Sequence, residues 1–278
     1  MGALLSILLV ATPVAVTLDD LPFAGDVGPN DTKAAATARI LAALKKHAAA
    51  PIGFVVCGRE PKELLAQWKD ATLGNHSTEH KSLNALTLDA WTKDLLACDA
   101  QLKATPKYYR FPFLQEGKDP ETRDAAAAVL KKNGYRNAQV SIDTSDWLLA
   151  GLYVDALKKE DKARAANIGR DYVMHVRLAA QRYRSRGQSK WRRNIAHVLL
   201  LHANALAADW LDALLAALKK DGFEFTTLDA ALADPVYAEP EVYAGKIGLS
   251  WLYRITDTAA EQWKWDDAQT QKMSMPTG

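Results

Sequence analysis

Short runs of apolar residues, many of them β-branched, recur along the chain, and most are followed by a loop and a longer segment with helical spacing. Such runs, bounded by polar or glycine-containing turns, are typical of buried strands. The predicted strands are residues 14–18, 52–56, a short one before Asn75, 108–111, 138–142, 197–201 and 224–227. The predicted helices, rich in Ala, Leu and Lys, are residues 32–49, 62–69, 87–103, 119–132, 158–183 and 206–220. This alternation predicts βα units around a parallel sheet.

The number of βα units predicts a barrel. The chain has 278 residues without a Gly/Ser-rich linker, a repeat of fixed period or a shift in composition, so one domain is favoured over two. Seven or eight units in one domain of this length indicate an α/β barrel, complete or incomplete. Functional side chains of such barrels lie at the carboxyl ends of the strands. The polar residues at these ends, which we expect on one rim, are Asp19, Asp20, Asn75, His76, His80, Arg110, Asp143, Asp146 and His202.

Composition excludes several classes of protein. Hydrophobic residues make up 49% of the chain and charged residues 24%, which excludes disordered, collagen-like and coiled-coil proteins. The formal net charge of +2 gives no global field toward nucleic acid, so we expect no nucleic-acid partner. Two cysteines, Cys57 and Cys98, are too few for a disulfide scaffold or a structural zinc cage. They are interpreted as small buried apolar groups, and a single bridge between them stays open.

The N-terminal segment resembles an export signal. Residues 2–16 are almost wholly apolar but end in a polar run, too short for a membrane span of about 20 residues. Residues 4–10 followed by Ala11 are similar to the apolar core and small-residue exit of a secretory signal, although the usual positive charge is missing. Residues 1–11 are therefore predicted to be an export signal or an N-terminal extension, with a buried element before the first strand as the alternative. A periplasmic or secreted protein without stable membrane insertion is expected.

The spacing of two histidines indicates a metal site. His76 and His80 are four residues apart, so on one helical turn both imidazoles would face the same side and share an ion. The third ligand is predicted from the Asp19–Asp20 pair rather than from Glu79. Adjacent carboxylates at a strand end point to different sides, so one can bind the ion while the other takes a proton from water. Three protein ligands leave positions open, as in catalytic sites.

Five segments in this order resemble the motifs of one family. They are VAVTLDDLP (14–22), GNHSTEH (74–80), RFPF (110–113), DTSDW (143–147) and LLLH (199–202). They resemble the polysaccharide deacetylases, the NodB-like carbohydrate esterases of family 4. The resemblance implies a distorted (β/α)7 barrel with outer helices over residues 12–237, followed by an aromatic-rich extension, 238–278, packed on the barrel. It also implies metal-dependent removal of acetyl groups from N-acetylated sugars, or from O-acetylated xylan.

The resemblance implies a catalytic set. Asp19 matches the general base and His202 the general acid. The implied ligands of a divalent ion, usually Zn²⁺ or else another divalent transition metal, are Asp20, His76 and His80. The ion would polarise the acetyl carbonyl while Asp19 deprotonates water and His202 protonates the leaving amine.

The resemblance also implies supporting residues. Arg110 matches the residue that orients the base, and Asp146 the residue that tunes the acid histidine. Trp147 matches a wall of the substrate groove, and the backbone N–H of Phe113 an oxyanion donor. Leu21 stands where the family usually has Gly, and Phe113 where it usually has Tyr. The Asp-Asp-Leu-Pro variant is similar to that of a bacterial subgroup, and the family resemblance implies the class of reaction but not the substrate.

Asp143, a basic run and the tail aromatics can each be interpreted in two ways. Asp143 is either a partner of the catalytic residues or a turn residue. The basic run over residues 182–193 is interpreted as a solvated face, with a phosphate-bearing polymer as the alternative. The tail aromatics are expected to cover apolar surface, with stacking on sugar rings as the alternative. They are Tyr243, Trp251, Tyr253, Trp263 and Trp265.

The leading prediction is a zinc-dependent deacetylase acting on N-acetylated glycans of the chitooligosaccharide or peptidoglycan type. The acetylated glycan is then the expected partner, and the oligomeric state stays open. One alternative is an O-acetyl esterase, and another is a non-catalytic glycan-binding protein on the same scaffold. A third, an iron oxygenase with two histidines and one carboxylate, is disfavoured because oxygen chemistry needs neither the spare base nor the acid.

Overall fold

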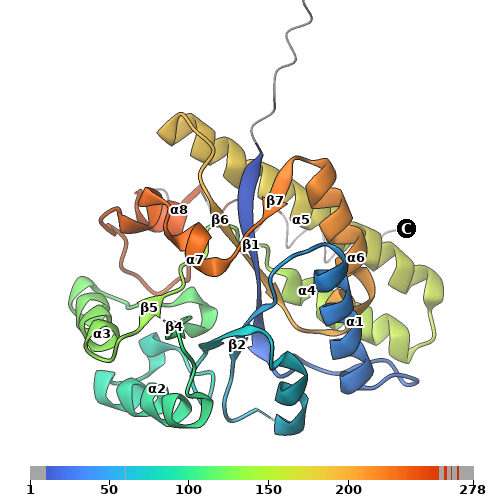
Figure 1. Ribbon diagram of the computed structural model, residues 1–278, viewed down its shortest axis with the longest axis horizontal. Coiled ribbons are helices and arrows are strands. Elements are labelled where there is room, and N and C mark those ends of the chain that lie inside the picture. The colour runs from blue at the N-terminus through green and yellow to red at the C-terminus, as the bar shows by residue number, and fades with distance from the viewer. Residues whose placement is uncertain (1–10, 60, 257–259, 262–263, 265–267, 269–278) are drawn as a thin grey trace, which may run out of the picture.

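β1 (Thr12–Leu21) is the strand around which the protein is built (Figure 1). The computed structural model describes residues 11–59, 61–256, 260–261, 264 and 268. In this part of the chain a 7-stranded parallel sheet runs in the order β5-β4-β3-β2-β1-β6, with β7 also paired to β1. The other strands are β2 (Ile52–Val55), β3 (Thr72–Asn75), β4 (Tyr108–Tyr109), β5 (Arg136–Asn137), β6 (His197–His202) and β7 (Phe223–Phe225).

Backbone hydrogen bonds curl this sheet into a distorted barrel. Downstream of β5 the chain reaches Ile142, which forms a parallel bridge with Leu199 of β6. The Ile142 N–H donates to Val198 and the Leu200 N–H donates back to Ile142, each over 3.0 Å. The chain that follows β5 therefore closes onto β6, and the predicted distorted (β/α)7 barrel is confirmed. The predicted strand 138–142 is wrong in its bounds: β5 is Arg136–Asn137, and of residues 138–142 only Ile142 forms a bridge.

Capped helices cover the sheet. They are α1 (Lys33–Lys46), α2 (Leu88–Leu102), α3 (Pro120–Lys132), α4 (Asp146–Lys158), α5 (Lys162–Trp191), α6 (Ala205–Lys220), α7 (Leu228–Leu232) and α8 (Trp251–Arg254). Short 3₁₀ helices are η1 (Lys62–Trp68), η2 (Leu83–Ala85), η3 (Pro112–Leu114) and η4 (Pro235–Ala238). Thr32, Thr87 and Asn204 each accept a backbone N–H at a helix start, as N-cap residues do. Helices α1, α4, α5 and α6 pack together on one side of the sheet (Figure 1).

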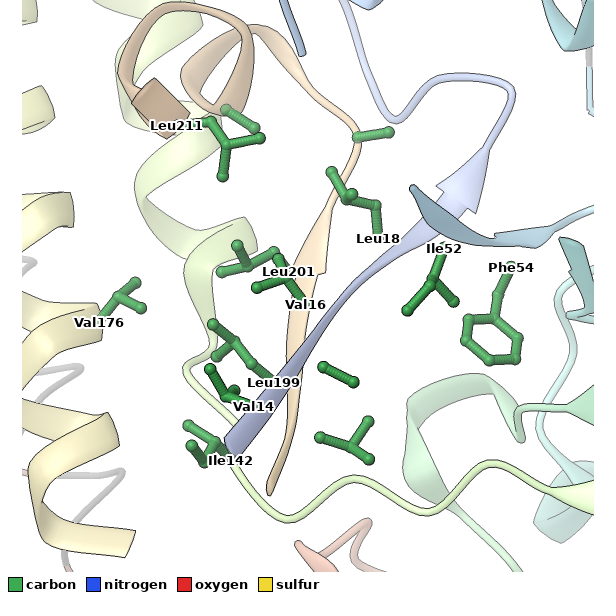
Figure 2. Packing of buried hydrophobic residues seen from close by; sticks show 14 of the residues in the cluster. Val14, Val16, Leu18, Ile52, Phe54, Ile142, Val176, Leu199, Leu201 and Leu211 are labelled. Carbon is green, nitrogen blue, oxygen red and sulfur yellow. The ribbon is translucent and has the colours of Figure 1, made fainter. Parts of the chain in front are cut away.

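The main core lies between the sheet and these helices. Val14, Val16 and Leu18 of β1 are almost fully buried. Figure 2 shows them beside Leu199 and Leu201 of β6, with side chains of α5 and α6 on the same face. Since both faces of β1 are covered, its sequence is a nearly continuous apolar run rather than an alternating one. This core holds the carboxyl end of β1, where Asp19 and Asp20 lie, in a fixed position.

One predicted helix has different bounds, and a helix before it was not predicted. The helix expected over residues 158–183 is α5, which begins at Lys162 and runs on to Trp191, whereas α4 precedes it and ends at Lys158. Glu160, at φ 55°, adopts the left-handed conformation that breaks the helix between them. Helix α4 begins at Asp146, so two of the predicted site residues, Asp146 and Trp147, stand in its first turn.

The two cysteines form a disulfide. Cys57, which follows β2, is bonded to Cys98 of α2, so the interpretation as separate apolar groups is wrong and the open alternative of a bridge is confirmed. Both residues are buried, as expected. The bond ties the loop after β2 to the helix that supports the histidine loop described below.

Replacing both cysteines with serine is expected to lower the free energy of unfolding by about 4 kcal/mol. The bridge spans a sequence separation of 41 residues, and loop closure of that length restricts the unfolded chain by about this amount. Urea denaturation followed by circular dichroism measures the change. Reductant should reproduce the loss in the wild-type protein and have no effect on the double variant. Unchanged stability of a fully reduced wild-type protein would contradict the prediction.

The basic run on α5 is largely paired. Arg184 donates to the Asp221 carbonyl and stacks over Phe223, and Arg193 pairs with Asp234. Arg182 donates to Tyr253, and Arg186 pairs with Glu261 of the C-terminal extension. The interpretation as a solvated face is therefore wrong for Arg182, Arg184 and Arg186, which are half-buried and hold neighbouring elements together, whereas Arg193 is exposed, as that interpretation expects.

The C-terminal extension packs on the barrel as far as it is described. Trp251 and Tyr253 are buried, in keeping with the expectation that tail aromatics cover apolar surface. Trp263, Trp265 and the predicted export signal lie outside the described residues. Among the described residues, no helix has both the length and the apolar character needed to cross a membrane.

Candidate active site

Asp19 and Asp20 lie at the end of β1 and point to different partners. Asp19 is paired in register with His202 of the neighbouring strand β6. Asp20 adopts a left-handed backbone conformation, with φ 69°, which turns its carboxylate toward the two histidines. Arg59 holds it there, because its guanidinium lies 3.1 Å from both the backbone carbonyl and the carboxylate of Asp20. The two neighbouring carboxylates are thus available for two different tasks.

A tight loop after β3 carries His76 and His80. The predicted helical turn is wrong: the segment is a loop in which Ser77 and His80 have φ of 71° and 54°. Asn75 ends β3 and accepts the Ser77 N–H, and the Ser77 hydroxyl in turn accepts the His80 N–H over 2.8 Å. Asp94 of α2 accepts the N–H groups of Thr78 and Glu79, which lie between Ser77 and His80. These bonds bring the two rings to one side, with their centroids 4.9 Å apart.

Three side chains form a group suited to a metal ion. One ligand atom from each of Asp20, His76 and His80 lies within 4.8 Å of the others. Oδ1 of Asp20 is buried and has no hydrogen-bond partner in the described part of the chain, although it lies 3.1 Å from Nε2 of His80. A buried carboxylate oxygen without a donor is unfavourable unless a cation completes its environment. The donor set therefore fits a divalent ion such as zinc.

The two imidazoles are prepared to be neutral ligands. Burial lowers the pKa of both His76 and His80 to about 4, despite the nearby Asp20 carboxylate. Nδ1 of His76 lies 2.7 Å from the Arg110 carbonyl, which only accepts, so Nδ1 carries the proton and Nε2 keeps its lone pair. Glu79 is exposed and pairs with Lys81, as expected of a residue outside the ligand set.

Asp19 is a buried carboxylate held by a buried arginine. Its side chain is only 3% exposed, and Nη1 of Arg110 donates to its Oδ1 over 3.0 Å. Arg110 is itself fixed by the Ala138 carbonyl and by the ring of Phe54, 4.2 Å below the guanidinium. Burial raises the pKa of Asp19, while Arg110 acts in the opposite direction. The remaining oxygen of Asp19 points toward His76, 3.7 Å from its Nε2.

His202 and Asp146 form the second pair. Oδ1 of Asp146 lies 2.6 Å from Nδ1 of His202, and its Oδ2 accepts the His202 backbone N–H over 3.0 Å. These two bonds orient the imidazole and leave Nε2 as the atom on the opposite edge of the ring. Burial alone would lower the pKa of His202, but Asp146, with smaller contributions from Asp20 and Asp19, outweighs it and raises this pKa to about 9. The imidazole is therefore protonated near neutral pH and can donate from Nε2.

The candidate ligands, Asp19 and His202 lie around one cavity of about 680 Å³. Asp19, Asp20, both loop histidines and His202 line its floor, together with Asp143. Trp147 and Phe113 are 57% and 58% exposed and form apolar parts of its wall. Asp143 accepts the Ser145 N–H, so it is both a turn residue and a cavity residue. Six of the nine residues predicted on one rim therefore line the same cavity, whereas Asn75, Arg110 and Asp146 are not among its lining residues.

Two residues that hold the site were missed from sequence. Arg59 clamps Asp20, and Asp94 clamps the histidine loop. Neither lies in a recognised motif, since Arg59 follows β2 and Asp94 stands within α2. The sequence offered one clue, and it concerned Asp94. This charged residue stands among the apolar positions of a helix, where the structure shows it to be half-buried.

The fold and the cavity together define a class: a distorted α/β barrel with a His/Asp group at the carboxyl ends of its strands. The model of the family described as polysaccharide deacetylase matches residues 10–138, which contain Asp19, Asp20, His76, His80 and Arg110. The resemblance to the polysaccharide deacetylases is thereby confirmed. The match supports deacetylation of polysaccharides as the general class of reaction.

Solved structures share the fold at low identity. The family 4 carbohydrate esterase PdaA of Bacillus subtilis is 20% identical, with a TM-score of 0.52 over 80% of this chain and 81% of that one. The polysaccharide deacetylase Bc1974 of Bacillus cereus is 20% identical, with a TM-score of 0.50 over 78% and 91%. The pseudoenzyme BA3943 of Bacillus anthracis is 15% identical, with a TM-score of 0.51 over 80% and 66%. A search among curated proteins gave no match.

Proposed function

We propose that this protein is a metal-dependent hydrolase that removes acetyl groups from N-acetylated sugars of the chitooligosaccharide or peptidoglycan type. One observation carries the proposal: a His/Asp group suited to a cation lies between a buried carboxylate, Asp19, and a carboxylate-paired imidazole, His202, in a single cavity. Hydrolysis of an amide requires a proton acceptor for water and a proton donor for the leaving nitrogen. The cavity offers both beside the ion-binding group.

Asp20, His76 and His80 would hold the ion, and zinc fits this donor set of two neutral imidazoles and one carboxylate. When bound, the ion would polarise the acetyl carbonyl and make water more acidic. The proposed role of Asp20 agrees with its electrostatics. Burial alone would raise its pKa, but His76, His202, His80 and Arg59 together outweigh burial, and the pKa falls to about 2. Asp20 is therefore a carboxylate at any pH at which the protein works.

The chain's own residues would move the protons. Asp19 would accept a proton from the attacking water, with Arg110 holding its other oxygen in place. The new C–O bond forms at the acetyl carbon, and the backbone N–H of Phe113 would stabilise the charge that develops on the carbonyl oxygen. His202 would then donate its Nε2 proton to the nitrogen as the C–N bond breaks. The products are acetate and the free amino sugar.

A non-catalytic glycan-binding protein remains the alternative from another class. It has a counterpart among similar folds, since BA3943 is described as a family 4 pseudoenzyme. Catalysis is favoured here because a binding protein needs neither the Asp19–Arg110 pair nor the His202–Asp146 pair. An O-acetyl esterase would use the same residues and differs only in the leaving atom. We further propose a periplasmic or secreted location, because the Cys57–Cys98 disulfide is typical of oxidising compartments.

The test is acetate release by the zinc-loaded protein from chitooligosaccharides, peptidoglycan and acetylated xylan. We expect release from the N-acetylated substrates, loss of activity after chelation and recovery when zinc is restored. Release from xylan alone would replace the proposal with the O-acetyl esterase. Glycan binding that survives chelation, without release from any substrate, would replace it with the binding protein.

A further inference from the structure

A segment of the C-terminal extension closes into a loop that lies against the third motif. We call residues 240–255 the C-terminal strap. The backbone N–H groups of Val242 and Tyr243 both donate to the Arg254 carbonyl, over 2.9 and 3.0 Å, so the two ends of the strap meet. Figure 1 shows the part of this segment around α8 beside the barrel.

The third motif and the four residues that follow it, 110–117, are treated below as one segment, the extended third motif, which contains two residues in an unfavourable backbone conformation. Phe113 and Leu114 have φ of 59° and 53°, in the left-handed region that side-chain-bearing residues rarely adopt. This conformation turns the Phe113 ring into the cavity, where its centroid lies 4.7 Å from that of His80. Residues held in this way need support from surrounding structure.

The strap supplies that support through three backbone contacts. Gly248 lies directly against Phe113: a Cβ at this glycine would stand 1.7 Å from the Phe113 carbonyl oxygen. Nη1 of Arg254 donates to the Leu114 carbonyl over 3.4 Å. The Gly245 N–H donates to the Gly117 carbonyl over 3.0 Å. The strap therefore contacts the extended third motif at both unfavourable residues and at its end.

Charged and polar side chains anchor the strap to the extended third motif, α3 and β5. Arg254 is 1% exposed, and its Nε pairs with Glu241 of the strap and lies 3.7 Å from Glu116 of the extended third motif. Asn137 of β5 donates to Glu116 over 2.6 Å. Arg123 of α3 donates to two strap carbonyls, those of Glu241 and Tyr243. A buried charge network of this kind fixes the strap and the extended third motif to the same framework.

The other end of the strap is anchored to the chain that leads to Asp143 and Asp146. The Trp251 N–H donates to the Val140 carbonyl over 2.6 Å, and the Ser250 hydroxyl donates to the Ser141 carbonyl over 2.8 Å. Arg182 of α5 donates to the Tyr253 hydroxyl over 2.8 Å. The strap thus joins the extended third motif to the opposite side of the cavity.

We propose that the C-terminal strap is a positioning element of the active site, in which Gly248 and Arg254 hold Phe113 and Leu114 in the left-handed conformation that places Phe113 at the cavity. Its effect on turnover rests on the proposed deacetylase function, whereas its effect on the backbone does not. Gly248 is required because the carbonyl of Phe113 occupies the place where any side chain would begin. Arg254 binds the following carbonyl while satisfying two buried carboxylates.

The test is Gly248→Ala, whose methyl group must displace the Phe113 backbone. A displacement of about 1 Å in a catalytic framework lowers turnover about 100-fold, so we expect kcat for acetate release to fall by that factor with KM little changed. Hydrogen exchange at the Leu114 and Gln115 amides, which donate to Phe111 and Pro112, should become faster. The midpoint of thermal unfolding and zinc binding serve as checks on the overall fold.

Gly28→Ala is the matched control, because its methyl group would press on the flexible side chain of Leu157, 3.2 Å away, and Gly28 lies outside both the strap and the cavity lining. It should keep wild-type kcat and wild-type exchange. Unchanged kcat and exchange in Gly248→Ala, or equal changes in both variants, would overturn the inference. If the wild-type protein releases no acetate, faster exchange in Gly248→Ala alone upholds the positioning role while the proposed function fails. Should Gly248→Ala not fold, faster exchange at Leu114 in Arg254→Lys decides the question in the same way.

Discussion

Asp19→Asn is expected to lower kcat for acetate release at least about 100-fold while leaving zinc binding intact, since loss of a general base has an effect of this size. The amide keeps the shape of the side chain but cannot accept a proton from water. The ligand set of Asp20, His76 and His80 is untouched by the change. Acetate release under substrate saturation measures kcat, and calorimetric titration with zinc measures the site.

The substitution also removes the charge that Arg110 faces, so the fold must be checked. Arg110 keeps its bond to the Ala138 carbonyl and its contact with Phe54, and the side-chain amide oxygen introduced by Asp19→Asn would still accept from Nη1. Asp212→Asn is the matched control, because it breaks the contacts of an aspartate with Lys46 and His47 away from the cavity lining. It should retain full activity. A tenfold loss or less in Asp19→Asn, with the fold and zinc binding intact, would exclude Asp19 as the base.

The barrel was predictable because its signals are local. The run from Val14 to Leu18 is buried on both faces, so every position is apolar or small, and a pattern of this kind is visible in one sequence. Helix starts at Thr32, Thr87 and Asn204 carry their own N-cap signals. The polar residues at strand ends were also predictable as a group, since parallel strands place their carboxyl ends at one rim.

The conformation of the histidine loop was not predictable from spacing alone. Two histidines four residues apart converge on a helical turn, and they converge equally well on the loop that Ser77 and His80 form at positive φ. The choice between the two is made by Asn75 and Asp94, which accept the N–H groups of the loop. Asp94 comes from the next helix, so its contribution requires the tertiary fold.

The sequence left the pairing of the two cysteines open and did not predict the role of the C-terminal strap, both for the same reason. Cys57 and Cys98 resemble ordinary buried residues until α2 is packed beside the loop after β2. Gly248 stands in a stretch without strand or helix pattern, and its importance comes from a carbonyl more than a hundred positions earlier in the chain. Contacts between segments so far apart leave no local trace in composition or periodicity.

The Asp19–Arg110 and His202–Asp146 pairs flank the ion-binding group, and electrostatics gives the histidines of the cavity different protonation states. Asp146, Asp20 and Asp19 keep His202 charged, with a pKa raised to about 9 despite burial, whereas burial outweighs the nearby Asp20 at His76 and His80 and keeps them neutral. One protein thus holds histidines of opposite protonation state in one cavity. This difference supports the proposed role of His202 as the proton donor and of the other two as ligands.

His202→Asn is therefore expected to lower kcat for N-acetylated glycans about 1,000-fold, within the range for loss of a general acid, while sparing 4-nitrophenyl acetate. The amino group of a sugar must be protonated to leave, whereas nitrophenolate leaves without a proton. The ratio of the two rates, measured on the zinc-loaded variant, reports the missing proton donor. Asp19→Asn is the internal comparison, because loss of the base should slow both substrates. Equal losses on both substrates in His202→Asn would show that His202 does not act as the acid.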